Sequence, residues 1–301
     1  MNRAVPSPAA HAEPEGTSDR AVLRVENLEV RYRGTGLRRV GVEAVRGVSF
    51  SVGRGETVAL VGESGSGKSS IGNAILGIAP VTSGQIVVCG EDVTRIRRRE
   101  RAKLALLAQM VFQNPYGSLN PSLTIGQIIG EPLRVQQRLS RAEAAQKTAA
   151  LLDAVGLPGD AAARYPSHFS GGQRQRIAVA RAIATEPYLV ICDEPTSALD
   201  VSTQASVLRL LMDLRNRLKL SYLFITHDLA VARQFAHRAV VLNEGRIVEE
   251  GTARQICEAP ANPYTRRLVA AAPVPDPVIQ AGRRKARQSL AAGDPETRLV
   301  R

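Results

Sequence analysis

The chain has 301 residues, of which 44% are hydrophobic, so it is long and apolar enough for one large domain or two small ones with a substantial core. Its formal net charge is +12, and chains this basic bind nucleic acid, anionic lipid or acidic partners. Tryptophan is absent and aromatic residues make up only 4% of the chain, so the aromatic platforms that stack the bases of single strands are poorly supplied. We therefore expect the basic residues to form a solvated or membrane-adjacent face, and we expect no nucleic-acid partner.

Neither a membrane span nor a cysteine-based framework is expected from this composition. No stretch approaches the ~20 consecutive apolar residues that span a membrane, and residues 1–19 lack the apolar run of a secretory signal, which predicts a cytosolic chain. The three cysteines, Cys89, Cys192 and Cys257, are far apart and form no CxxC pair, which argues against a zinc site and against disulfides. We expect buried, reduced thiols.

The first third of the chain is predicted to consist mostly of strands. Residues 1–20 are rich in Pro, Ala and Glu without periodicity and are interpreted as a disordered leader. Alternating or short apolar runs then predict strands at residues 22–30, 45–52, 57–61 and 85–89. A turn at residues 90–92 after the last of these predicts a hairpin.

A glycine-rich loop, GESGSGKS at residues 62–69, lies between the predicted strand at 57–61 and a helix-compatible segment at 69–78. Glycines allow successive backbone N–H groups to converge on phosphate oxygens, and the helix that follows points its N-terminus at the anion. In such a loop the lysine, Lys68, reaches the β- and γ-phosphates, and the serine hydroxyl, that of Ser69, ligates Mg²⁺. The pattern predicts a binding site for a nucleoside triphosphate.

Helical patterns dominate from about residue 95 to residue 156. Ser140 and Glu143 form a capping box that opens a helix ending at Gly156. A second glycine pair, in Ser-Gly-Gly-Gln at residues 170–173, leads into a predicted helix at 177–184. Such a helix N-terminus can cradle a second anion, although a simple N-capped surface helix is the alternative interpretation.

Strands and helices alternate in the second half of the chain, which predicts a mainly parallel sheet with helices on its faces. Strand-like runs occupy residues 188–192, 222–226 and 239–242, and a helix is predicted at 202–218. The first of these strands ends in Asp193 and Glu194, so Asp193 can reach the metal held by the phosphate loop and Glu194 becomes the candidate base for an attacking water. From about residue 271 the sequence is typical of a loose basic tail.

Five motifs together resemble the ATP-binding cassette family over residues 23–251: the phosphate loop, residues 170–173, residues 189–194, residues 197–200 and His227. The resemblance implies an α/β P-loop NTPase fold with a mainly parallel core sheet, an antiparallel β subdomain and a helical insertion at about 95–180. It divides the chain into the leader 1–20, the cassette 21–255, and a C-terminal extension with basic tail at 256–301. One departure is Phe169, where the commonest signature begins with Leu; we expect another apolar residue still to seat the loop.

The resemblance also implies residue roles, with ATP and Mg²⁺ as substrate and cofactor. It implies catalytic roles for Lys68, Gln113, Glu194 and His227. The implied metal contacts are Ser69, Gln113 and Asp193. The implied nucleotide contacts are Tyr32, Gly62, Glu63, Ser64, Gly65, Ser66, Gly67, Lys68, Ser69, Ser70, Ser170, Gly171, Gly172, Gln173 and Asp200.

Four of these assignments carry a specific expectation from the family. Tyr32 is expected to stack on adenine, and Gln113 to contact both the metal and the lytic water at the start of a loop that faces a membrane partner. His227 is expected to hydrogen-bond the γ-phosphate, and Asp200 to couple two sites across a dimer. In the family the Ser-Gly-Gly-Gln segment of one cassette covers ATP on another, so this chain must pair with a second cassette, either a copy of itself or a different subunit.

Two further segments resemble the ATPases of dipeptide and oligopeptide importers: residues 111–121, VFQNPYGSLNP, and residues 259–268, APANPYTRRL. Tyr165-Pro166 fits the same group, and the Asn-Pro-Tyr turn is also a helix-start signal. Some members carry clustered C-terminal cysteines for an iron–sulfur centre, but only Cys257 occurs here, so none is predicted.

The resemblance implies an ATPase subunit that powers peptide import from the cytoplasmic face of the inner membrane. The implied partners are the second cassette, two multispanning permeases and, indirectly, an extracytoplasmic solute-binding protein. Two alternatives stay open: import of nickel or another small solute, and a soluble assembly or remodelling ATPase such as that of phosphonate degradation. Cassettes that act on DNA or ribosomes are disfavoured, because they usually fuse two cassettes or insert long coiled coils.

Overall fold

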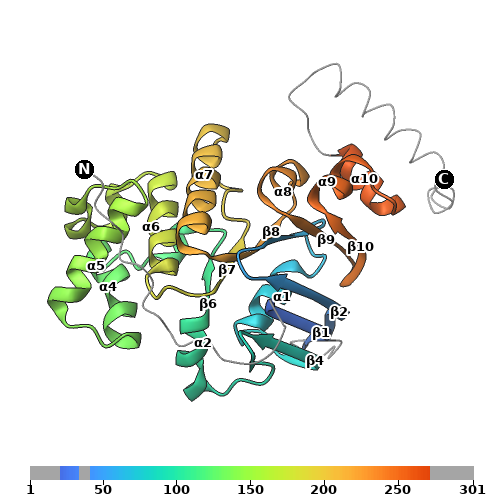
Figure 1. Ribbon diagram of the computed structural model, residues 1–301, viewed down its shortest axis with the longest axis horizontal. Coiled ribbons are helices and arrows are strands. Elements are labelled where there is room, and N and C mark those ends of the chain that lie inside the picture. Colours follow the sequence, from blue (N-terminus) through green and yellow to red (C-terminus); the bar gives the residue numbers. More distant parts are fainter. Residues whose placement is uncertain (1–20, 34–40, 272–301) are drawn as a thin grey trace.

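The computed structural model describes residues 21–33 and 41–271 (Figure 1). The predictions for the leader 1–20 and for the basic tail after residue 271 lie outside the described residues. No helix in the described part of the chain combines the length and apolar character needed to cross a membrane.

A four-stranded antiparallel sheet forms the first subdomain, with strand order β2-β1-β4-β5. Its strands are β1 (Ala21–Tyr32), β2 (Val42–Gly53), β4 (Val81–Val88) and β5 (Glu91–Asp92). One face is apolar, because alternate residues of β1 and β2, such as Leu23 and Val52, are buried. The predicted strands at 22–30 and 45–52 and the predicted hairpin at 85–92 are confirmed.

A six-stranded sheet forms the centre of the molecule, with strand order β10-β9-β3-β8-β7-β6. Its strands are β3 (Thr57–Val61), β6 (Ala108–Val111), β7 (Leu189–Asp193), β8 (Ser221–Thr226), β9 (Arg238–Asn243) and β10 (Arg246–Thr252). All neighbours pair in parallel except β10, which runs antiparallel to β9. Every residue of β3 and β8 is buried, as expected of strands covered on both faces. The mainly parallel core sheet is confirmed.

Side chains that alternate along β3 build different cores on the two faces of this sheet. Val58 and Leu60 pack with α1 (Lys68–Ile75) and the antiparallel sheet. Ala59 and Val61 pack with three later helices: α8 (Leu229–Phe235), α9 (Ala253–Glu258) and α10 (Pro263–Ala271). The beginning of α10 at Pro263 agrees with the predicted helix start.

A helical layer lies beside the β6 end of the sheet (Figure 1). It contains α4 (Ile125–Gln136), α5 (Arg141–Ala154) and α6 (Gly171–Ile183), which share one core with α7 (Val201–Leu218) and with buried residues of β7 and β8. The predicted capping box of Ser140 and Glu143 opens α5, and both of its backbone N–H groups are bonded.

The predicted helical run from residue 95 to residue 156 is wrong at residues 108–111. These residues form β6, which follows α2 (Arg101–Leu107), precedes the one-turn α3 (Pro115–Ser118), and pairs in parallel with β7. Four apolar residues between helices carry no periodicity that distinguishes strand from helix, and pairing with β7 decides the outcome.

The three cysteines form no disulfide in the described part of the chain. Cys192 is buried, as predicted, whereas Cys89 and Cys257 are only partly buried. Burial raises the pKa of the Cys89 thiol to about 11, so this thiol is protonated at neutral pH.

Candidate functional site

At two glycines of the phosphate loop, any side chain would clash with the backbone of a neighbouring element. Gly67 precedes α1 with φ of +104°, and a Cβ there would lie 2.3 Å from the carbonyl oxygen of Ala44. A Cβ on Gly62 would lie 2.3 Å from the carbonyl oxygen of Leu242. The loop is therefore fitted between β2 and the β9–β10 hairpin, and it presents the first N–H groups of α1 to an anion.

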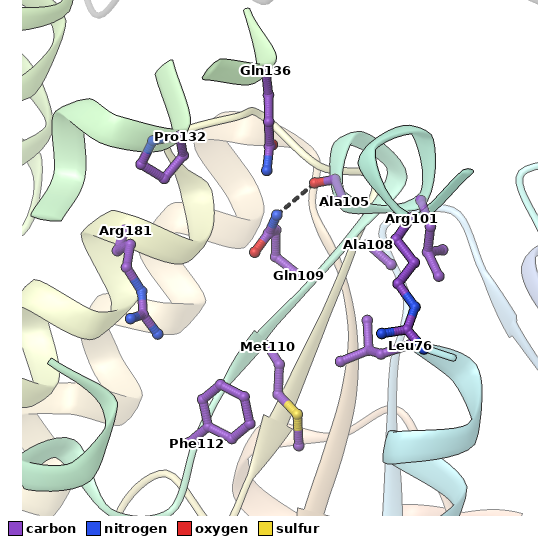
Figure 2. Close-up of a pocket in the computed structure, with 11 residues that line it drawn as sticks. Leu76, Arg101, Ala105, Ala108, Gln109, Met110, Phe112, Pro132, Gln136 and Arg181 are labelled. Carbon is purple, nitrogen blue, oxygen red and sulfur yellow. Dashed lines mark hydrogen bonds between the residues drawn. The ribbon is translucent and has the colours of Figure 1, made fainter. Parts of the chain in front are cut away.

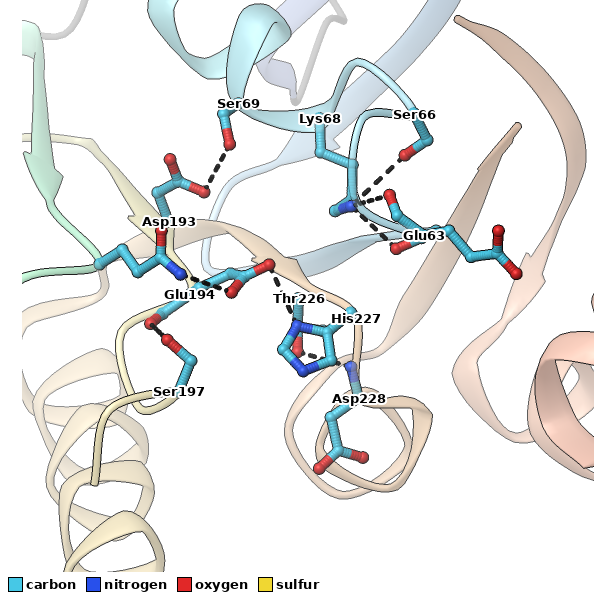
Figure 3. Close-up of polar contacts among 12 residues, drawn as sticks. Glu63, Ser66, Lys68, Ser69, Asp193, Glu194, Ser197, Thr226, His227 and Asp228 are labelled. Atoms are coloured by element: carbon cyan, nitrogen blue, oxygen red, sulfur yellow. Dashed lines mark hydrogen bonds and ion pairs between the residues drawn. The ribbon is translucent and has the colours of Figure 1, made fainter. Parts of the chain in front are cut away.

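Lys68 is buried inside this loop and is held by the loop's own backbone (Figure 3). Its Nζ donates to the carbonyl oxygens of Gly62 at 2.8 Å and Glu63 at 2.7 Å. Burial lowers the pKa of Lys68, whereas the nearby charges of Glu194, Asp193 and Glu63 raise it. The arrangement places the Lys68 amino group at the centre of the loop. Phosphate oxygens bound there would replace the water that this group loses on burial.

Ser69 and Asp193 bring two oxygen atoms together although they are 124 positions apart in the chain. The Ser69 hydroxyl donates to Asp193 Oδ1 at 3.1 Å (Figure 3). Burial raises the pKa of Asp193, and the Ser69 hydrogen bond opposes this shift. Hydroxyl and carboxylate oxygens are hard donors, and Mg²⁺ in nucleotide sites takes one or two of them and completes its shell with phosphate and water. The donor set therefore fits the predicted metal.

Glu194 is held between two other candidate catalytic residues. Its Oε2 accepts a hydrogen bond from Gln113 Nε2 at 2.9 Å, and its Oε1 lies 3.1 Å from His227 Nδ1 (Figure 3). Its backbone has φ of +44° and its N–H donates to the carbonyl oxygen of Ile225. Left-handed backbone is rare for a residue other than glycine, and such strain is typical of functional sites. The carboxylate is aimed across the ends of β7 and β8.

Tyr32 lies at the end of β1, partly buried against the core of the antiparallel subdomain. Its hydroxyl donates to Ser70 Oγ at 3.3 Å, at the start of α1. The ring is thus next to the phosphate loop, as an adenine contact requires, and the stacking role stays a prediction.

Residues 170–173 form the first turn of α6 and its cap. Ser170 Oγ accepts from the Gln173 N–H at 3.3 Å, and Gln173 Oε1 accepts from the Ser170 N–H at 2.9 Å. Phe169 is buried, as expected for the apolar residue before the motif. Figure 1 shows α6 well apart from α1, with β7 between them, so this segment does not reach the phosphate loop of the same chain.

Asp200 caps α7 rather than pointing at any other candidate site residue. Its Oδ1 accepts the N–H groups of Ser202 at 3.1 Å and Thr203 at 3.0 Å, and its two oxygens accept both hydroxyls at 2.6 Å. Hydrogen bonds from the Ser202 and Thr203 hydroxyls hold the pKa of Asp200 below its usual range. The proposed coupling across a dimer stays a prediction.

The sequence prediction missed three contacts that shape the phosphate loop. The Ala44 carbonyl lies against Gly67, the Gly245 N–H donates to the Ser66 carbonyl at 3.0 Å, and the Tyr264 hydroxyl accepts the Glu63 N–H at 3.3 Å. No local pattern identifies these partners, because each comes from a distant element.

A pocket of about 290 Å³ lies between α2, β6, α4 and α6 (Figure 2). Met110 and Phe112 form its apolar floor, and Arg101 and Arg181 contribute guanidinium groups. The buried Oε1 of Gln136 accepts no hydrogen bond from any described residue. Because Phe112 directly precedes Gln113, the pocket is one residue away from the Glu194 contact.

Comparison with known families places these motifs in one class. Residues 45–197 match the model of the ABC transporter family, and the chain belongs to that family. Residues 248–296 match a second model, the oligopeptide/dipeptide transporter C-terminal region. The chain is thus an ABC-type ATPase that uses ATP, and the predicted α/β P-loop cassette fold is confirmed.

Three relatives carry names that refer to the transport of peptides, oligopeptides or glutathione. The chain is 47% identical over 261 residues to a probable peptide ABC transporter ATP-binding protein, y4tS, of Sinorhizobium fredii, covering 85% of this chain and 74% of the relative. It is 45% identical over 270 residues to the oligopeptide transport ATP-binding protein OppF of Lactococcus lactis, covering 88% and 85%. It is 47% identical to the glutathione import ATP-binding protein GsiA of Escherichia coli, covering 86% of this chain but only 42% of GsiA.

Two solved structures share the fold. The ATP-binding cassette MJ0796, in a dimeric post-hydrolysis state with ADP and Pi, has a TM-score of 0.69 and 30% identity, covering 77% of this chain and 99% of that one. The cassette cbiO1 of Clostridium perfringens, part of the transporter complex cbiONQ, has a TM-score of 0.68 and 26% identity, covering 79% and 91%.

Proposed function

We propose that this chain is the ATP-hydrolysing, nucleotide-binding subunit of a membrane importer for dipeptides or oligopeptides. The observation that carries the proposal is the combination, in one chain, of a cassette with the oligopeptide/dipeptide transporter C-terminal region at residues 248–296. Relatives named for peptide, oligopeptide and glutathione transport support the same solute class. Peptide uptake would be driven by ATP-dependent closure of a cassette dimer and by hydrolysis that reopens it.

The phosphates of ATP bind, in this proposal, between the Lys68 ammonium group and the first N–H groups of α1. Lys68 already lies inside the loop, held by two carbonyl oxygens, so little ordering is needed when phosphate arrives. Ser69 and Asp193, with Gln113, would hold Mg²⁺ beside the phosphates. Bound there, the metal neutralises negative charge on the phosphate oxygens.

Glu194 acts as the base that accepts a proton from the attacking water. Its carboxylate is the acceptor of the Gln113 amide and lies within hydrogen-bond reach of His227, so both neighbours fix its orientation. His227 is 58% exposed while Glu194 is 18% exposed, so the histidine ring can also face an incoming γ-phosphate. The proton moves from water to the Glu194 carboxylate as the water oxygen attacks the γ-phosphorus, and the bond from that phosphorus to the bridging oxygen breaks, so that ADP leaves and inorganic phosphate forms.

The second half of each ATP site comes from a partner cassette. The capped turn at residues 170–173 stands apart from the phosphate loop of its own chain, and the backbone N–H groups of Gly171 and Gly172 at this helix N-terminus are suited to a phosphate on another chain. We propose pairing with a second ABC ATPase subunit, a different chain or a second copy of this one. Asp200, next to this interface, would couple the two sites.

The pocket beside Phe112 receives a cytoplasmic helix of a multispanning permease. Its apolar floor fits apolar side chains (Figure 2). The Arg101 guanidinium group fits a carboxylate, and the Gln136 carbonyl oxygen, which accepts no hydrogen bond from a described residue, fits an N–H donor. A displacement of that helix would be transmitted to Glu194 through Phe112 and Gln113. Two permeases, one for each cassette, would hold the chain at the cytoplasmic face of the inner membrane, and an extracytoplasmic solute-binding protein would select the solute.

Purification from detergent-solubilised native membranes tests this function. We expect two multispanning proteins and a second cassette ATPase to co-purify, and vesicles containing the complex to take up labelled dipeptides or oligopeptides when ATP is supplied. A soluble complex with no membrane subunit, or uptake of nickel instead of peptides, would contradict the proposal.

A matched pair of variants tests the pocket. Arg101→Glu reverses a charge in the pocket, and we expect it to lose the permeases while keeping ATP binding. Arg254→Glu reverses the charge of an exposed arginine on α9, remote from the pocket, and serves as the control. Equal recovery of permeases with both variants would argue against this docking surface.

A further inference from the structure

The segment from Asn262 to Leu268 has been given no role in ATP binding or hydrolysis above, yet it lies against the strand that leads into the phosphate loop. Leu268 of α10 is buried in one cluster with Ala59 and Val61 of β3. Figure 1 shows α9 and α10 beside β9 and β10. Because β3 ends at the phosphate loop, α10 shares a core with the strand that positions that loop.

Hydrogen bonds fix the start of α10 to β10. The Glu249 carboxylate accepts the N–H groups of Ala261 at 2.7 Å and Asn262 at 3.2 Å. The Asn262 side chain donates to the Val248 carbonyl at 3.1 Å and accepts the Tyr264 N–H at 2.8 Å. The backbone of Tyr264 is thus held by the Asn262 side chain, independently of any contact that the Tyr264 side chain makes.

The Tyr264 side chain reaches the phosphate loop. Its hydroxyl accepts the Glu63 N–H at 3.3 Å, although the two residues are 201 positions apart. The carbonyl group of Glu63 in turn accepts from Lys68 Nζ at 2.7 Å. One residue of the loop is therefore bound at its N–H by the C-terminal segment and at its carbonyl by the lysine that meets ATP.

A second residue of the loop is held in a similar way. The Gly245 N–H, in the β9–β10 turn, donates to the Ser66 carbonyl at 3.0 Å. Burial raises the pKa of Tyr264, so its hydroxyl stays protonated and uncharged at neutral pH. Two residues of the loop are thus held by elements that follow β8 in the chain.

We propose that Tyr264 is a positioning residue for ATP, which acts through the Glu63 backbone to hold the phosphate loop and Lys68 in the binding-competent arrangement. The inference rests on the nucleotide site proposed above. Without the hydroxyl, the Glu63 peptide group can turn, and the fraction of molecules with a competent loop falls. The apparent ATP affinity falls in proportion to that fraction.

The test compares Tyr264→Phe with Tyr222→Phe in the full chain. Both changes remove one phenol oxygen, but the Tyr222 hydroxyl is buried in β8 and has no hydrogen-bond partner among the described residues. We would measure the ATP dissociation constant, KM and kcat of ATP hydrolysis, Tm, and hydrogen exchange at the Glu63 amide. The loss of a hydrogen bond between neutral groups predicts a rise in Kd and KM of roughly two- to tenfold for Tyr264→Phe.

The proposal is supported if KM rises in Tyr264→Phe while kcat and Tm stay at the wild-type values, the Glu63 amide exchanges faster, and Tyr222→Phe binds ATP normally. Unchanged KM in Tyr264→Phe, or a fall in Tm without a change in KM, would overturn it. Failure of the wild-type chain to bind ATP would instead refute the nucleotide site itself, so the two results are distinguishable.

Discussion

Replacement of Glu194 by glutamine removes the candidate base while keeping its surroundings. A glutamine has the same shape, and its carbonyl oxygen can still accept from Gln113 at the position where Glu194 Oε2 now does so at 2.9 Å. Its amide N–H can donate to His227 Nδ1, which lies 3.1 Å from Oε1. The change therefore removes basicity with little loss of geometry.

General-base catalysis contributes roughly 10²- to 10⁴-fold to a rate, equivalent to about 3–5 kcal/mol of activation free energy. We expect Glu194→Gln to lower kcat for ATP hydrolysis by this factor, to bind ATP with near-wild-type affinity, and to accumulate as an ATP-bound closed dimer. Phosphate release measures the rate, nucleotide titration measures the affinity, and size-exclusion chromatography with ATP and Mg²⁺ measures the dimer.

Glu91→Gln provides the control for the loss of one carboxylate. Glu91 forms an exposed ion pair with Lys103 at 2.9 Å on the antiparallel subdomain, and such pairs contribute little. Hydrolysis by Glu194→Gln at a rate within threefold of the wild type would refute the assignment of Glu194 as the base.

Three further predictions address the loop and the helix cap. Lys68→Ala removes an ammonium group from the phosphate loop, and ATP titration should show affinity at least about tenfold weaker, since bonds to charged groups are worth more than neutral ones; equal affinity would count against the loop as the site. Gly67→Ala adds a Cβ 2.3 Å from a carbonyl oxygen at a residue with positive φ, so Tm should fall by at least about 2 °C and ATP binding should weaken. Gly159→Ala is the control, because no described atom lies within 4 Å of its new Cβ, and its Tm and ATP affinity should match those of the wild type. The Asp200 carboxylate has a lowered pKa in the folded state because of hydrogen bonds led by that of Ser202, so its stabilising effect is present above the unfolded pKa of about 3.9 and is lost as the pH falls towards the folded value. Asp200→Asn should therefore lower Tm by more at pH 6 than near pH 2, and a constant difference across that range would contradict the cap.

Much of the fold was predictable because its signals are local. The capping box of Ser140 and Glu143 satisfies helix N–H groups within one turn, and it appears in the structure where the sequence predicts it. The buried strand at 57–61 and the glycine loop after it form a contiguous unit of strand, turn and helix. In contrast, β6 was missed, because only its pairing with β7 distinguishes this short apolar run from a helix.

Individual site residues were predictable from motifs, but their contacts were not. Ser69 and Asp193 are 124 positions apart, and Gln113 and Glu194 are 81 apart. They meet because parallel strands place their carboxyl ends on one edge of the sheet. Which atoms bond at that edge depends on strand order, and the spacing of motifs along the chain does not contain strand order.

The sequence by itself determined that this chain binds a nucleoside triphosphate, because glycine conformation, the lysine and the helix start are consecutive in residues 62–69. Tertiary structure decided how the loop is held, by contacts from Ala44, Gly245 and Tyr264. It also decided that residues 170–173 lie apart from their own phosphate loop and that a pocket is lined by Phe112, the residue before Gln113. The physical reason is that backbone conformation is set mostly by neighbouring residues, whereas burial and hydrogen-bond partners depend on segments that only the packed sheet brings together.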